Sequence, residues 1–93
     1  MSGNENAWGI RIPSLGGRVL DNDVLTVIPT GIYYGVGIEV GSAGDNALVV
    51  GNRITAAPWG VLFFGGAIGK YRDNLTSGVS QPFQGGTDAG GNN

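Results

Sequence analysis

The chain contains no cysteine and no histidine, and only 13% of its 93 residues are charged. Without cysteine there are no disulfides or thiolate metal sites, and without histidine there are no imidazole ligands and no catalytic triads that use them. The net charge is −2 with no basic run, which favours neither nucleic acid nor a membrane surface as a partner. The sequence also shows no signal-peptide pattern and no apolar run of about 18 residues that could span a membrane. We expect no cofactor and no metal site.

Helix signals are almost absent, because glycine interrupts most of the chain at short intervals. With 19 glycines and 41% apolar residues, the chain has short Val, Ile, Phe and Tyr runs bounded by Gly, Asn, Asp or Pro, which is typical of an all-β protein. A chain of this length forms one domain with a thin core. The predicted strands are residues 8–12, 18–20, 23–28, 36–40, 47–50, 53–55, 60–64 and 74–79.

Two landmarks recur three times in the same order. The first is a strand that reads glycine, apolar, variable, apolar, and the second is an asparagine that follows that glycine by 13, 15 and 14 residues. A period in the twenties built from short strands predicts a solenoid, in which successive coils stack to bury a shared core. The strands are "GIRI" (9–12), "GIEV" (37–40) and "GVLF" (60–63), and the asparagines are Asn22, Asn52 and Asn74.

These coils resemble those of the right-handed parallel β-helix repeat proteins, the pectate-lyase-like group. The likeness rests on "GVGIEV" (35–40), "NALVVGNRITAAPWGVLFF" (46–64) and "GKYRDNLTSGV" (69–79). It implies an all-β, right-handed parallel β-helix of about three coils over residues 8–80. The composition of residues 1–7 and 81–93, which is polar and rich in glycine and asparagine, predicts flexible termini there. Enzymes, adhesins and tail proteins share this fold, so the resemblance predicts the fold and not the activity.

In such a fold the three asparagines stack at a corner about 4.8 Å apart, the spacing of paired strands. We expect Asn22, Asn52 and Asn74 to form a structural ladder in which each side-chain amide bonds its neighbours. We assign the left-handed backbone of the corner to the asparagine itself. Asp21 and Asp73 directly precede two of these asparagines, which is typical of turns. The alternative is that the asparagines are ligands for a sugar or a metal ion.

Alternation of side chains along each strand assigns the faces of the glycine-led strands. Arg11, Glu39 and Leu62 fall in one outward column, in which Arg11 and Glu39 form an exposed ion pair worth about 0 to 1 kcal/mol. Leu62 does not belong on a solvated face. The column therefore predicts an apolar outer surface near the last coil.

The predicted apolar surface combines Leu62 and Phe64 with Trp59, while Tyr33 and Tyr34 form a second cluster. Because exposed apolar patches usually mark interfaces, we expect these five residues to lie in the interface of a homo-oligomer with closed symmetry. The alternative is that the C-terminal tail folds back over the patch, with the segment around residues 82–83 as its cover.

Two function hypotheses of different class follow. The first, which we favour, is a non-enzymatic structural or interaction module, either a small self-associating β-helix or the terminal coils of a larger surface or secreted repeat protein. The second is a carbohydrate-binding or polysaccharide-processing β-helix with Trp8, Tyr71, Lys70 and Arg72 as glycan contacts. Polysaccharide lyases of the family use calcium-binding acids beside a basic residue, and Lys70, Arg72 and Asp73 superficially resemble that set. A single coil supplies them, so we expect no catalytic residue and no enzymatic activity.

Overall fold

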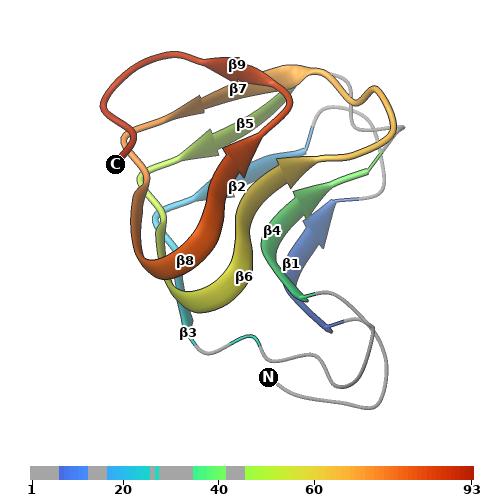
Figure 1. The fold of residues 1–93 in the computed structure, drawn as a ribbon. Coiled ribbons are helices and arrows are strands. Elements are labelled where there is room, and N and C mark those ends of the chain that lie inside the picture. Colours follow the sequence, from blue (N-terminus) through green and yellow to red (C-terminus); the bar gives the residue numbers. More distant parts are fainter. Residues whose placement is uncertain (1–6, 13–16, 26, 28–34, 42–45) are drawn as a thin grey trace.

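The described part of the chain is all-β, as predicted. The computed structural model describes residues 7–12, 17–25, 27, 35–41 and 46–93, which contain strands and no helix (Figure 1). Within these residues, then, no helix is long and apolar enough to cross a membrane. The strands are β1 (Ala7–Ile12), β2 (Arg18–Leu20), β3 (Asp23–Leu25), β4 (Gly35–Val40), β5 (Ala47–Val50), β6 (Arg53–Phe63), β7 (Gly69–Arg72), β8 (Leu75–Gln84) and β9 (Thr87–Asp88).

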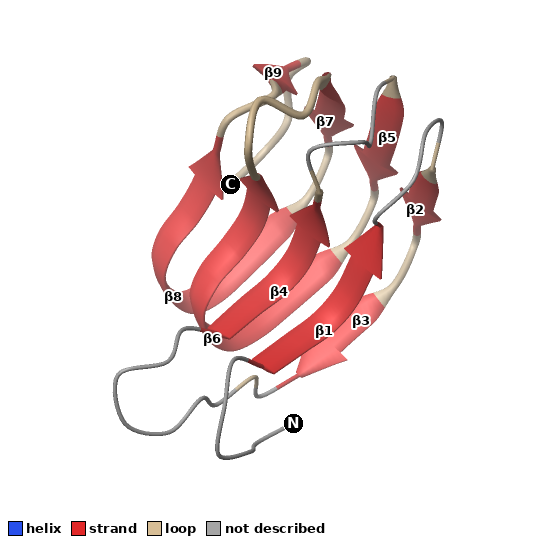
Figure 2. Ribbon diagram, turned by 90° about the vertical axis from the view of Figure 1, so that its right-hand side faces the viewer, coloured by secondary structure: helices blue, strands red, loops and turns tan. Residues whose placement is uncertain are grey.

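The described strands form two sheets with parallel neighbours. Sheet 1 contains β1, β4, β6, β8 and β3, and sheet 2 contains β2, β5, β7 and β9. Apart from β3 and β4, which both belong to sheet 1, successive described strands alternate between the sheets. The strands of one turn of the chain through both sheets, a pass, pair in parallel with those of the previous pass. Figure 2 shows β1, β4, β6 and β8 side by side in that order, with β2, β5, β7 and β9 in the same order beyond them.

The longest strand, β6, bends as it passes between two sets of neighbours. Its residues 53–55 pair with β3, whereas residues 59–63 pair with β4. Between these two parts, Ala56 has a φ of 57°, a left-handed conformation that is uncommon for a residue other than glycine. The sequence predicts two separate strands here, but pairing with β8 continues on both sides of the bend. One strand therefore contributes to two successive passes.

The aliphatic core lies between the two sheets. Ile38 and Val40 of β4, Val49 of β5, and Ile54 and Val61 of β6 are each 0% exposed. All five belong to one continuous cluster of buried apolar side chains. Removal of their apolar surface from water is the main source of stability that a chain without disulfides has available.

An aromatic group extends this core toward the last pass. The Tyr71 ring of β7 stacks on Phe83 of β8, with 5.1 Å between centroids, and lies 6.0 Å from the Phe63 ring of β6. Phe83 packs against the core cluster. The sequence raised the alternative that this region covers the outer patch of β6; Phe83 instead lies on the inner side.

Residues 81–93 differ from the flexible tail that their composition predicts. β8 continues to Gln84, and β9 pairs with β7. At the end of the chain, the Asn93 N–H donates to the carbonyl of Asn74 at 2.9 Å, and the Thr76 N–H donates to the carbonyl of Asn93 at 2.7 Å. Backbone pairing needs no apolar side chain, so a glycine-rich segment can still add a layer to both sheets. Of the predicted N-terminal tail, only Ala7 lies in the described residues, where it begins β1.

Deleting residues 85–93 should therefore destabilise the protein. The truncated chain loses the pairing of β9 with β7 and the hydrogen bonds of the last residues to Asn74 and Thr76. At about 0.5 to 1.5 kcal/mol net per hydrogen bond, we expect the free energy of unfolding to fall by roughly 2 kcal/mol or more. Urea denaturation followed by circular dichroism measures this change. An unchanged midpoint would show that the segment does not pair in solution.

Candidate functional site

Four asparagines form a continuous hydrogen-bonded row, the asparagine ladder, where the chain leaves sheet 2. The backbone N–H of each donates to the side-chain Oδ1 of the next: Asn22 to Asn52 at 2.9 Å, Asn52 to Asn74 at 3.0 Å, and Asn74 to Asn92 at 3.1 Å. The side-chain Nδ2 of each donor residue reaches the same oxygen, at 3.2, 3.0 and 2.9 Å respectively. Each accepting oxygen is therefore held by two donors from the previous pass.

The two inner rungs of the ladder are buried. Asn52 is 1% exposed and Asn74 is 0% exposed. Their Nδ2 groups also donate to main-chain carbonyls of the previous pass, that of Asn52 to Val19 and that of Asn74 to Val49, both at 2.9 Å. A buried amide without partners costs on the order of 1 to 3 kcal/mol. Asparagine fits this place because its oxygen accepts from the previous pass, while its amide group donates both to that pass and to the next.

Sequence reasoning missed the fourth rung, Asn92. This residue follows Asn74 by 18 positions, whereas Asn74 follows Asn52 by 22. The shorter spacing and the glycine-rich surroundings concealed it. The signal that could have found it is the Gly-Asn pair at residues 91–92, which matches Gly-Asn at residues 51–52.

The left-handed backbone of the corner belongs to the residue before each asparagine. Asp21, Gly51, Asp73 and Gly91 have φ angles of 54°, 69°, 55° and 70°. The sequence argument assigned this conformation to the asparagine itself. That assignment was wrong, because the left-handed residue is the one directly before the asparagine. Aspartate and glycine both tolerate it, glycine because it has no Cβ and aspartate because its short polar side chain bonds locally. The alternation of acid and glycine at this position is thus explained by backbone geometry.

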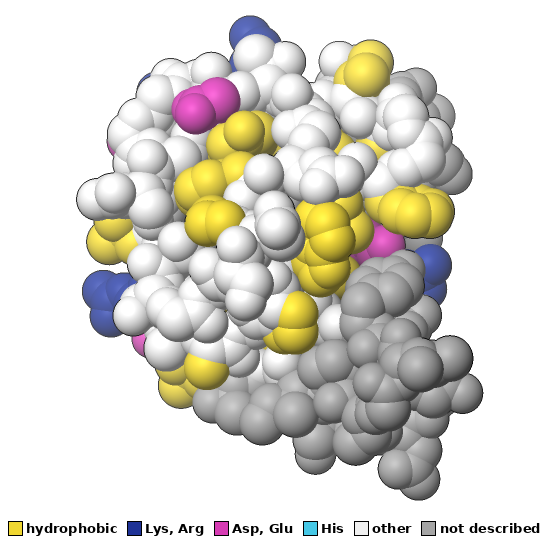
Figure 3. Space-filling view, in the orientation of Figure 1, with side chains coloured by type: hydrophobic (Ala, Val, Ile, Leu, Met, Phe, Trp, Pro, Cys, Tyr) yellow, Lys and Arg dark blue, Asp and Glu magenta, His cyan; other side chains and the backbone are white. Residues whose placement is uncertain are grey.

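Trp59 and Leu62 of β6 lie together with Phe64, the residue after β6, on the outer side of sheet 1. With Gln84 they line a hollow of about 300 Å³, the apolar hollow. Phe64 is 53% exposed, whereas Leu62 is only 6% exposed. Figure 3 shows apolar side chains at the surface in this region of β6 and β8. The expected outer patch is therefore a hollow with one prominent exposed ring. Tyr33 and Tyr34, the second expected cluster, lie outside the described residues.

The predicted pair of Arg11 and Glu39 differs in its burial from the expectation. Arg11 Nε lies 3.2 Å from Glu39 Oε2, but the two side chains are 54% and 3% exposed. The Arg11 guanidinium also lies over the ring of Trp8, 4.6 Å from its centroid. Strand alternation correctly pairs these positions but does not reveal how deeply the carboxylate lies. Loss of Arg11 would leave a buried charge, which is more costly than loss of an exposed pair.

The residues expected to contact glycans do not share one surface. Tyr71 belongs to the core and is 8% exposed, and its burial, together with the charge of Asp88, raises the pKa of its hydroxyl above the ordinary 10.0. Arg72 Nε lies 3.1 Å from Asp73 Oδ2 in a pair that is more than half exposed. Lys70 points outward from sheet 2, whereas Trp8 and Trp59 are on strands of sheet 1.

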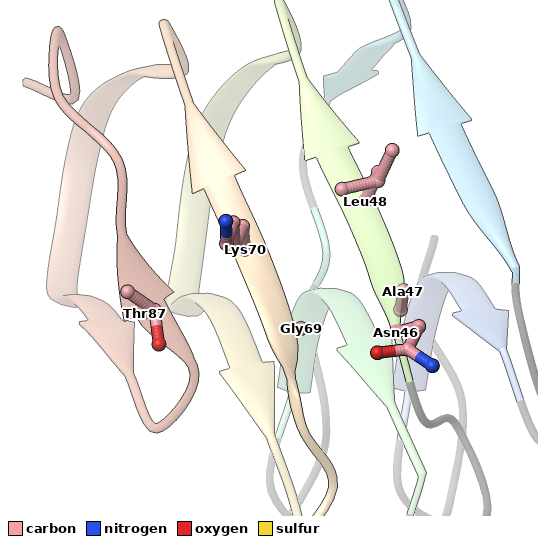
Figure 4. Close-up of a pocket in the computed structure, with 6 residues that line it drawn as sticks. All are labelled: Asn46, Ala47, Leu48, Gly69, Lys70 and Thr87. Carbon is pink, nitrogen blue, oxygen red and sulfur yellow. The ribbon is translucent and has the colours of Figure 1, made fainter.

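Lys70 borders a second hollow, of about 330 Å³, on the outer face of sheet 2 (Figure 4). Its other lining residues come from β5, β7 and β9 and the residue before β5, and they include Leu48 and Thr87 but no aromatic ring. Among the residues that the structure describes, no group of three or more Asp or Glu side chains could hold a metal ion. This surface offers a cation beside a wall of mixed apolar and polar groups.

Comparison of the chain with protein-family models, with curated proteins and with solved structures gives no match.

Replacing Asn52 should test the ladder at its most constrained rung. Asn52→Ala removes the acceptor of Asn22 and leaves the buried carbonyl of Val19 without its donor. We expect a loss of about 1 to 3 kcal/mol in the free energy of unfolding, measured by urea denaturation. Asn22→Ala is the matched control, and it should cost less because Asn22 is only partly buried. Equal or negligible effects for the two variants would contradict a ladder whose inner rungs are buried.

Proposed function

We propose that the chain is a short right-handed parallel β-helix that serves as a non-enzymatic structural or interaction module and self-associates through the apolar hollow. The proposed likeness of the chain to the pectate-lyase-like group concerns the fold and not the activity. It assigns no catalytic residue, cofactor or metal to the chain, and its partner is a second copy of itself.

The β-helix part of this proposal is supported by the register of the strands. Val19 pairs with Val49, which pairs with Tyr71, so equivalent positions of successive passes form a column. The same holds for Ile10, Ile38 and Val61 in sheet 1. Stacking of this kind buries an apolar column that no single pass could bury, which is the physical basis of a solenoid.

Self-association is supported by one observation, the exposure of Phe64 beside the apolar hollow. Of the four consecutive apolar residues 61–64, the first three are buried, which leaves Phe64 as the one whose side chain is exposed. At about 25 cal/mol per Å² of apolar surface, covering the ring of Phe64 and the walls of the hollow contributes a few kcal/mol. That contribution is large for a domain whose total stability is on the order of 5 to 10 kcal/mol.

A second copy of the chain is the occupant that we favour, because its own apolar hollow presents the same exposed ring. In a closed rotational arrangement each copy presents the same surface to the other. The two surfaces cover one another, and no further copies can add at this contact.

The carbohydrate alternative has less support. Its proposed cations, Lys70 and Arg72, are on sheet 2, and Tyr71 is buried.

Phe64→Glu should convert the assembly to monomer. Phe64 is 53% exposed, so a charged side chain there costs the folded monomer little but is unfavourable inside a contact. Light scattering coupled to size exclusion measures the mass at micromolar concentration. The matched control is Ile68→Glu, which introduces the same charge at an apolar residue that is 55% exposed and does not line the hollow. We expect Ile68→Glu to keep the mass of the wild type.

Two results would contradict self-association through the apolar hollow. One is a wild-type protein that is monomeric throughout the concentration range. The other is a Phe64→Glu variant whose mass equals that of the wild type, which would move the contact elsewhere on the molecule.

A further inference from the structure

The last pass of the chain carries a charge in a column that is otherwise apolar and aromatic. In sheet 2 the register joins Val19, Val49, Tyr71 and Asp88 across four strands. The first three side chains are buried, at 4%, 0% and 8% exposure. Asp88 takes the corresponding position on the final strand, β9, where no further described strand covers it and it is exposed. A carboxylate in this column is compatible only with an end of the stack.

Asp88 also ends the asparagine ladder. Its Oδ1 accepts hydrogen bonds from the Asn92 Nδ2 at 2.7 Å and from the Gly90 N–H at 2.8 Å. In the inner rungs, the equivalent Nδ2 donates to the Oδ1 of the next asparagine. The carboxylate of Asp88 therefore takes the place of the amide oxygen that a further pass would bring.

The opposite end of the stack differs in its chemistry. Within the described residues, β1, β2 and β3 each pair on one side only. The Oδ1 of Asn22, unlike that of the other ladder residues, accepts no hydrogen bond from any residue that the structure describes. A hollow of about 180 Å³ opens at this end, and its lining includes Val24 and Val27 of the core and Ile10, which packs against the core. Strand edges, an amide acceptor and apolar surface are the features that the last pass of another copy would cover.

We propose that Asp88 prevents copies of the chain from stacking end to end, last pass on first pass, and so limits the protein to closed assembly. This inference rests on the proposed β-helix fold but not on the contact through the apolar hollow. Its partner surface is the first pass of a second copy, in which β1, β2 and β3 would continue the parallel register of β8 and β9.

The physical reason lies in what end-to-end stacking would bury. Continuing the column would place Val19 of the second copy over the Asp88 carboxylate, with no cation supplied by that residue. The Asp88 oxygen would also approach the Oδ1 of Asn22 in the second copy, which accepts no hydrogen bond from a described residue, so that two acceptors would meet. Burial of an ionised carboxylate without a partner is strongly unfavourable, and an inward-pointing charge on an edge strand is a known means of blocking strand addition.

Asp88→Asn tests this inference with the smallest possible change. The asparagine keeps an oxygen that accepts from Gly90 and Asn92, removes the charge, and adds an amide donor that can meet Asn22 of the next copy. We expect linear assemblies in negative-stain electron microscopy and a rise of at least tenfold in weight-average mass by light scattering. The wild type should form no such assemblies over the same concentrations.

Asp73→Asn is the matched control, because it removes the same charge from an exposed aspartate that faces solvent beside Arg72. It should leave the mass unchanged. The inference is overturned if folded Asp88→Asn keeps the wild-type mass, or if Asp73→Asn assembles equally. Should Asp88→Asn unfold, Asp88→Ser replaces it, and unfolding of both variants also overturns the inference, since the carboxylate would then be needed for folding.

Repeating Asp88→Asn in a Phe64→Glu background separates this inference from the proposed self-association. Linear assemblies that persist in the double variant show that end stacking is independent of the apolar hollow. If Phe64→Glu alone leaves the mass unchanged while Asp88→Asn assembles, the contact through the hollow fails and the role of Asp88 stands.

Discussion

The hydrogen bonding of the buried corner amides is the constraint on which the rest of the structure depends. The Oδ1 of Asn52 accepts hydrogen bonds from the N–H and the Nδ2 of Asn22. The N–H and the Nδ2 of Asn52 in turn donate to the Oδ1 of Asn74. Because the inner rungs are shielded from water, a shift of one pass relative to the next by a single residue would leave several of these groups unpaired. The ladder therefore fixes the register of both sheets at the place where the chain passes between them.

The other features of the chain follow from that fixed register. A left-handed residue must precede each ladder asparagine, which explains why aspartate or glycine occupies the position. The fixed corner aligns the apolar columns that contain Ile38, Val49 and Val61, and these fill the space between the sheets. Local turn chemistry, ladder and core agree on one arrangement, and this agreement favours a single fold in a chain without disulfides.

Much of this arrangement could be predicted from the sequence, but not its ends. Spacing alone singled out Asn22, Asn52 and Asn74, which the structure joins by hydrogen bonds. It missed Asn92 because pairing of the last residues rests on backbone groups, which leave no apolar pattern in a segment rich in glycine. The continuity of β6 through Ala56 was equally hidden, since a left-handed alanine has no signature in sequence.

Burial of outward-facing side chains was the other feature that the sequence did not reveal. Alternation assigns a side chain to the inner or outer side of a strand, but it says nothing of what lies against the outer side. Glu39 and Leu62 are therefore more buried, at 2% and 6% exposure, than their outward column suggested. Phe64, just beyond the end of β6, is the residue whose exposure the sequence argument described best.

Native-state hydrogen exchange followed by NMR tests the central claim, the buried ladder, most directly. The account predicts that the backbone N–H and the side-chain Nδ2 protons of Asn52 and Asn74 exchange as slowly as the core amides of β4, because they open only when the register is lost. The backbone N–H of Asn92, at the exposed end, should exchange faster. Exchange of the Asn52 and Asn74 protons within about tenfold of an unstructured peptide would contradict the account.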